Sequence, residues 1–116
     1  MTTTNNLPVY KESYDLIEEL FRYVKEFNRE YKYTLGERVK TEMIALVIDI
    51  YRANSSIEKR GEHIKSARER VEVIRLLLRL LRDLRQLPLE KFVSLNVKIE
   101  SVSRQLTGWL KKSQAK

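Results

Sequence analysis

Apolar side chains recur every three or four residues along almost the whole chain, and this spacing is typical of helices with one buried face. The chain has only three glycines and two prolines in 116 residues, too few for a turn-rich β protein. The sequence therefore predicts an all-α fold, an antiparallel up-down-up-down four-helix bundle. The first two expected helices cover about 8–28 and 35–54. The third starts between 56 and 61 and ends at 87, and the fourth covers about 88–112.

Local signals mark where these helices begin and end. Pro8 suits the first position of a helix, where its missing N–H costs nothing. Thr34 and Glu37 have the spacing of a capping box, so the second helix is expected to start at Leu35. Pro88 separates the third and fourth helices, because the residue before a proline avoids the α region. We expect a disordered N-terminal arm over 1–7, one bundle domain over 8–113 and a basic tail end over 114–116.

Patterns that would indicate catalysis or metal binding are missing from the sequence. The chain has no cysteine and a single histidine, His63, which we interpret as a surface residue. It also lacks paired metal-ligand motifs and the glycine-rich loops that hold phosphates. We therefore expect no enzymatic activity, no cofactor, no metal and no small-molecule substrate. Without a long apolar run or a hydrophobic N-terminal segment, the protein is expected in the cytoplasm with no membrane partner.

Charge is divided unevenly between the two halves of the chain. Residues 1–58 contain 8 Lys or Arg against 10 Asp or Glu, a net charge of −2. Residues 59–116 contain 15 against 6, a net charge of +9. A cationic C-terminal half of this kind favours a polyanionic partner such as RNA or DNA over a charge that only keeps the protein soluble.

The third expected helix concentrates this positive charge. Four arginines spaced by 7, 4 and 3 residues fall on one side of the helix, and we call them the arginine stripe: Arg68, Arg75, Arg79 and Arg82. Their guanidinium groups suit the bidentate binding of phosphates, but they also suit packing over apolar side chains and pairing with carboxylates or with another subunit. Both interpretations stay open at this point. The candidate nucleic-acid-binding residues are Arg68, Arg70, Arg75, Arg79, Arg82, Arg85, Lys91, Lys98, Lys111 and Lys112.

The same helix is apolar on more than one side. One seam runs through Ile64, Ala67, Val71, Ile74, Leu78 and Leu81, and a second runs through Val73, Leu77, Leu80 and Leu84. A helix with two apolar seams in a small bundle generally has a neighbour besides its own core, so we expect a homo-oligomer. In the fourth helix, Trp109 is interpreted as a core anchor, with Gly108 allowing close approach of another backbone.

Four segments of the chain are informative in their order and spacing. They are Leu7-Pro8-Val9-Tyr10-Lys11, Arg29-Glu30-Tyr31-Lys32-Tyr33-Thr34-Leu35-Gly36-Glu37-Arg38, Ile50-Tyr51-Arg52-Ala53-Asn54 and Ser103-Arg104-Gln105-Leu106-Thr107-Gly108-Trp109-Leu110. Together these segments resemble the accessory variability determinant (Avd) family of diversity-generating retroelements. The resemblance implies a four-helix bundle that assembles into a barrel-like homopentamer with a basic surface. It also implies binding to a reverse transcriptase and its template RNA in support of adenine-directed, mutagenic retrohoming, with no catalysis by the Avd protein.

The alternative is the related four-helix bundle protein encoded in intervening sequences of bacterial 23S ribosomal RNA, a structural or RNA-binding module outside a retroelement. Its typical Ser-Asn-Ile-Ala-Glu-Gly-like segment is missing from the second helix. The corresponding residues are Met43-Ile44-Ala45-Leu46-Val47-Ile48-Asp49-Ile50. This departure favours the Avd resemblance.

Overall fold

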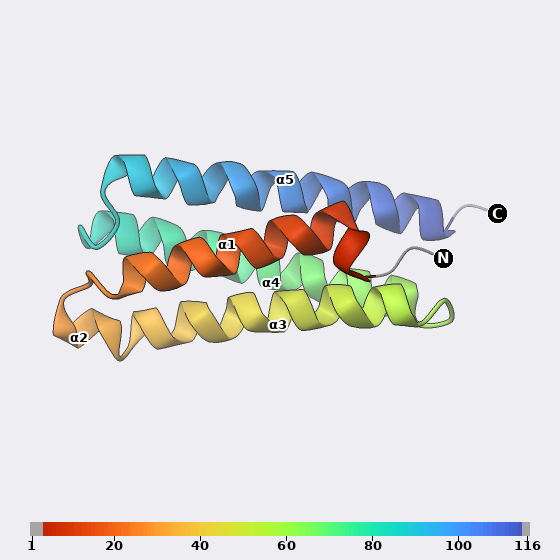
Figure 1. Cartoon of the computed structure of the whole chain (residues 1–116), viewed down its shortest axis with the longest axis horizontal. Helices are drawn as coiled ribbons and strands as arrows, with labels where there is room; N and C mark the ends of the chain where they lie inside the picture. Colours follow the sequence, from red (N-terminus) through yellow and green to blue (C-terminus); the bar gives the residue numbers. More distant parts are fainter. Residues whose placement is uncertain (1–3, 115–116) are drawn as a thin grey trace.

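Four long helices pack side by side in the computed structural model, which describes residues 4–114 (Figure 1). They are α1 (Pro8–Val24), α3 (Leu35–Ser55), α4 (Arg60–Asp83) and α5 (Leu89–Gln114). A short 3-10 helix, η1 (Thr4–Asn6), precedes α1, and a single turn, α2 (Arg29–Lys32), lies between α1 and α3. Successive long helices run in opposite directions, and each packs mainly against two neighbours in the cyclic order α1, α3, α4, α5. The predicted all-α four-helix bundle is confirmed.

The core follows the apolar faces that the sequence marks. All six residues of the first seam of α4 are at most 1% exposed. The second seam is divided, because Leu77 is buried and Val73 packs against the core while Leu80 is 39% exposed. Part of the apolar excess of α4 therefore belongs to the core of its own bundle, and part lies at the surface.

The corner between α1 and α3 differs from expectation. We expected the first helix to continue to about Asn28, but α1 ends at Val24 because the chain turns to bury Phe27, which is 4% exposed. Asn28 has an extended backbone, and its N–H donates to Oε1 of Gln86 at 2.7 Å in the α4–α5 connection. Gly36 closes the corner, since a Cβ there would lie 3.0 Å from Cγ1 of Val24.

The second expected helix, α3, starts at Leu35 as predicted, but the prediction of a capping box at its start is wrong. Thr34 is the N-cap residue, yet its side chain caps no helical N–H. The Thr34 hydroxyl instead donates backwards to the Glu30 carbonyl oxygen at 2.6 Å, and the Glu37 carboxylate pairs with Nζ of Lys40 at 3.3 Å. The turn α2 supplies that carbonyl oxygen, so the preceding turn competes with the helix for the cap residue.

The expected N-terminal arm over 1–7 includes one short helical element. Residues 4–6 form η1, and the Asn54 side-chain amide donates to Oγ1 of Thr4 at 3.1 Å. The basic tail end falls partly in α5, which continues to Gln114. Residues 1–3 and 115–116 lie outside the described residues.

An arginine occupies a left-handed position at the end of α4. Arg85 has φ 62°, the N–H of Arg85 donates to Arg82 O at 2.9 Å, and the N–H of Gln86 donates to Leu81 O at 2.8 Å. These two hydrogen bonds are those of a Schellman motif with Arg85 at the C′ position, where glycine is normally preferred. The helix therefore ends at Asp83, four residues before the expected stop at Leu87.

Arg85→Gly should stabilise the fold. Left-handed backbone costs a non-glycine residue about 1–2 kcal/mol, while glycine adds about 0.4–1 kcal/mol of unfolded-state entropy. We expect a net gain of about 0.5–1 kcal/mol in the free energy of unfolding, measured by urea denaturation. The matched control Arg79→Gly, an exposed position inside the same helix, should lose about 1 kcal/mol. Equal losses in both variants would contradict the left-handed assignment.

Candidate nucleic-acid interface

The arginine stripe lies along the boundary between α4 and α5. Arg75, Arg79 and Arg82 line one groove of about 390 Å³, whose other lining residues are Glu72 of α4 and Phe92, Asn96 and Glu100 of α5. Arg68 lies beside the next open depression, one to two turns toward the start of α4. The helical spacing therefore brings all four guanidinium groups to one face, as the sequence predicts.

Arg75 is tied to its own bundle. Its Nε and Nη2 donate to the two carboxylate oxygens of Glu100 on α5, each at 2.8 Å, and Nη1 bonds to Glu72. Hydrogen bonding to Glu100 raises the pKa of Arg75 and lowers the pKa of Glu100, even though partial burial opposes both shifts. A bidentate pair of this kind holds α4 against α5 and leaves little of the guanidinium for another anion.

Arg82 and Arg70 are engaged as well. The Arg82 guanidinium lies 4.7 Å from the centroid of the Phe92 ring, and its Nε pairs with Asp83 at 3.0 Å. Arg70 faces the other way, toward α3, where Nη1 is 3.3 Å from a Glu42 oxygen and Nε is 3.7 Å from an Asp49 oxygen. The structure thus separates Arg70 from the stripe.

The remaining arginines among the candidate binding residues are exposed. Arg68, Arg79 and Arg85 have no ion pair among residues 4–114. A further exposed arginine, Arg104 of α5, is close enough to Glu100 to lower the pKa of that carboxyl, and the sequence interpretation missed it. The signal that could have identified Arg104 is its spacing of four residues after Glu100 and seven before Lys111, which places the three on one side of the helix.

Two of the candidate lysines on α5 point away from the arginine stripe. Nζ of Lys98 lies 2.6 Å from a Glu19 oxygen of α1, and Nζ of Lys91 lies 5.0 Å above the ring of Tyr23. These two lysines therefore fill the α1–α5 boundary rather than extending the arginine face. Lys111 and Lys112, at the end of α5, are exposed.

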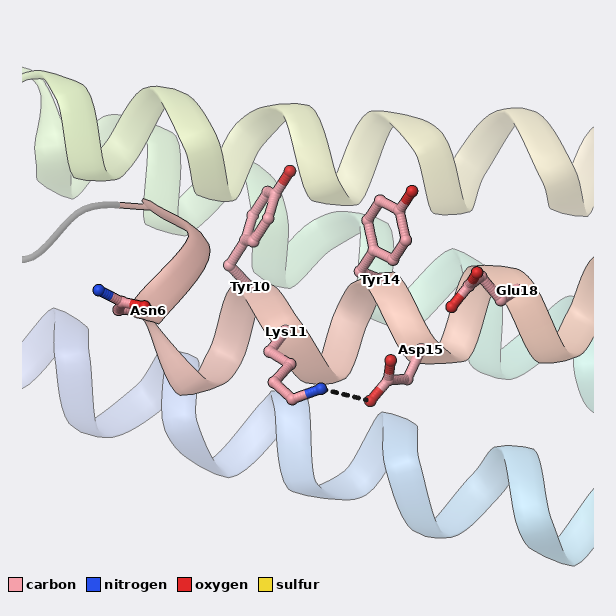
Figure 2. A pocket seen from close by; sticks show the side chains of 6 residues that line it. All are labelled: Asn6, Tyr10, Lys11, Tyr14, Asp15 and Glu18. Carbon is pink, nitrogen blue, oxygen red and sulfur yellow. Dashed lines mark ion pairs between the residues drawn. The ribbon is translucent and has the colours of Figure 1, made fainter.

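A second hollow lies on the opposite side of the bundle, above α1 (Figure 2). Tyr10 and Tyr14 point toward α3 with their ring centroids 6.3 Å apart, and Lys11 pairs with Asp15 at 3.8 Å. Asp15 and Glu18 form part of the lining. Two carboxylates beside one paired lysine make this hollow unsuited to a polyanion.

The interpretation of Gly108 as a point of close backbone approach is wrong. A Cβ at Gly108 would meet no atom within 4 Å, and the residue is exposed. Trp109 packs only partly against the core, and the Arg60 guanidinium lies 5.7 Å from the centroid of its ring. Arg60 also donates to the Ala53 carbonyl oxygen at 2.8 Å, so it ties the end of α3 to α5.

Residues 4–114 contain no group of three or more His, Asp or Glu side chains placed to hold a metal ion. His63 is partly buried near the start of α4. Over the same residues, no helix combines the length and hydropathy needed to cross a membrane.

Comparison with known proteins identifies one family. A family model described as bAvd-like matches residues 8–113, which cover the whole bundle from the start of α1 nearly to the end of α5. The match confirms the resemblance based on the four sequence segments. Comparison with curated proteins and with solved structures gave no match.

The buried Glu19–Lys98 pair predicts acid sensitivity. Burial alone would raise the pKa of Glu19, but hydrogen bonds from Lys98, Ser94 and Tyr23 outweigh it and hold the pKa below 4.5. The ionised carboxylate therefore stabilises the fold above pH 4.5, and this contribution is lost as the pH falls through the lower folded-state pKa. Glu19→Gln should lose about 1–3 kcal/mol of unfolding free energy at neutral pH.

The same variant should depend less on pH below 4.5 than the wild type, which urea denaturation across an acid pH series measures. Glu26→Gln, at an exposed position in the turn just after α1, is the control and should behave as the wild type. An unchanged acid profile in Glu19→Gln would contradict the assignment.

Proposed function

The chain belongs to the bAvd-like family, and we propose that it is a non-catalytic accessory protein of a diversity-generating retroelement. In this role it binds the template RNA, or the cDNA copied from it, together with the reverse transcriptase, and so supports mutagenic retrohoming. The observation that carries this proposal is the family match over residues 8–113, which favours it over a module encoded in 23S ribosomal RNA intervening sequences.

The outer face of α4 and α5 is the proposed nucleic-acid surface. Its exposed cations are Arg68 and Arg79 of α4 and Arg104 and Lys111 of α5. Arginines without a carboxylate partner keep all five N–H donors for phosphate oxygens, and each contact releases condensed counterions. Arg75 contributes mainly by holding the two helices together through Glu100.

Charge reversal on this face tests the proposal. We expect Arg68→Glu combined with Arg79→Glu to weaken RNA binding at least tenfold, and to flatten the dependence of log K on log salt by about 0.7–0.9 per lost phosphate contact. The measurement is fluorescence anisotropy of a labelled RNA at several salt concentrations.

The matched control reverses two exposed arginines outside this face, Arg22 of α1 and Arg52 of α3. Both double variants change the net charge equally, so a general charge effect would weaken them alike. Equal loss in the two variants, or an unchanged salt dependence in the first, would contradict the proposed surface. Circular dichroism checks that each variant keeps its helices.

We also propose that the protein forms a homo-oligomer, with the pentamer as the expected state for this family. A ring with an odd number of subunits joins two different faces of the subunit. Exposed apolar side chains lie on several outer faces, and we propose that two of them form the contact: Ile44 and Ile48 on α3, 44% and 42% exposed, and Leu76 and Leu80 on α4, 56% and 39% exposed. Burying these residues between subunits would leave the arginine stripe accessible, because it lies on a different side of α4.

Complementation between variants tests this arrangement. Ile44→Glu/Ile48→Glu should dissociate the ring, and so should Leu76→Glu/Leu80→Glu, because each places charges in a contact face. An equimolar mixture of the two variants should recover dimers, because each retains the face that the other has lost. Mass measurement by light scattering reads the outcome, with Ile57→Glu, 73% exposed in the connection between α3 and α4, as the control. A wild type that is monomeric would overturn the proposal.

A further inference from the structure

A groove at the end of the bundle that carries both termini is independent of the arginine face. It has a volume of about 430 Å³ and lies between the start of α1 and the last turns of α5. The apolar residues Leu7, Pro8 and Val9 form one wall. The other wall consists of residues on α5, namely Gln105, Gly108, Trp109 and Lys112.

Gly108 lowers the stability of α5, and no contact within the subunit explains why a glycine is placed there. A glycine inside a helix destabilises it by about 0.5–1 kcal/mol relative to alanine. Here the glycine has no positive φ, and a Cβ would meet no atom within 4 Å. What the missing side chain does provide is open access to the groove beside Trp109.

The chemistry of the groove combines an aromatic surface with positive charge. Trp109 offers the indole, and Lys112 is part of the lining. The lining contains no carboxylate, in contrast to the tyrosine hollow on α1, where Asp15 and Glu18 contribute. The Arg60 guanidinium, 5.7 Å from the indole centroid, and its hydrogen bond to Ala53 O hold this corner of the bundle in place.

We propose that this groove binds an unpaired nucleobase of single-stranded nucleic acid, with the base stacked on the indole of Trp109 and a neighbouring phosphate bound by Lys112. The proposal rests on the proposed nucleic-acid binding and adds to it a preference for unpaired strands. An aromatic ring flanked by cations is the usual means of binding single strands without reading their sequence. A base inside a duplex is already stacked on both sides, so duplex nucleic acid would engage the arginine face alone.

Trp109 is the only tryptophan of the chain, so its fluorescence reports directly on the groove. The probes are an oligothymidylate and an abasic oligonucleotide of the same length and charge. We expect the oligothymidylate to quench the tryptophan emission to saturation. The abasic strand should bind the arginine face without quenching, because it has phosphates but no bases.

Variants separate stacking from charge. Trp109→Leu keeps an apolar side chain against the core and should weaken oligothymidylate binding about tenfold, with abasic binding unchanged, as read by anisotropy of a labelled strand. Gly108→Leu retains the tryptophan but fills its access, so quenching should disappear. Gly108→Ala is the matched control for helix stability and should quench nearly as the wild type does.

Each other result overturns a different claim. If both strands bind and neither quenches, the groove proposal fails while nucleic-acid binding stands. If neither strand binds, the proposed function fails as well. Emission that responds to dilution of the protein and not to oligothymidylate would assign the groove to a protein contact and overturn the proposal.

Discussion

The position of α5 depends on ion pairs along both of its sides. On one side Arg75 of α4 binds both oxygens of Glu100, and on the other Lys98 binds Glu19 of α1. A core made of similar aliphatic side chains would tolerate a shift of one turn along the helix axis, because leucine and isoleucine pack comparably in either register. Partly buried charges do not tolerate such a shift, since an unpaired charge in that position is costly. These pairs therefore define how the helices align.

The same pairs determine which charges remain for function. Of the arginines on α4, two are joined to carboxylates of a neighbouring helix, and Arg82 lies on Phe92 beside Asp83. The positive charge of the C-terminal half is thus divided into a structural part inside the helix boundaries and an exposed part on the outer face of α4 and α5. Neither part can be recognised from net charge, because both consist of the same residue type on the same helix.

Helix faces and most helix ends could be predicted from the sequence, because the apolar spacing and Pro88 act locally. The bidentate partner of Arg75 could not be predicted, since it lies 25 positions away on another helix. The capping box predicted at Thr34 does not form for a related reason, because α2 places a carbonyl oxygen within reach of the Thr34 hydroxyl. The left-handed backbone of Arg85 could not be predicted either, because nothing in an arginine side chain indicates that conformation. The sequence indicates a particular role for Gly108, but only the structure shows that no atom lies close to it.

The boundary between α1 and α5 is the only one of the four that joins helices distant in sequence. The other three connect successive long helices, so their closure entropy is small and their contacts form from local chain. The α1–α5 boundary also has many polar contacts, with Glu12 accepting hydrogen bonds from Ser101 and Gln105, and Glu19 from Lys98. We therefore expect this boundary to close last during folding and to open first during native-state fluctuations. Amide protons of α1 should consequently exchange through a partial opening in which α3, α4 and α5 stay associated.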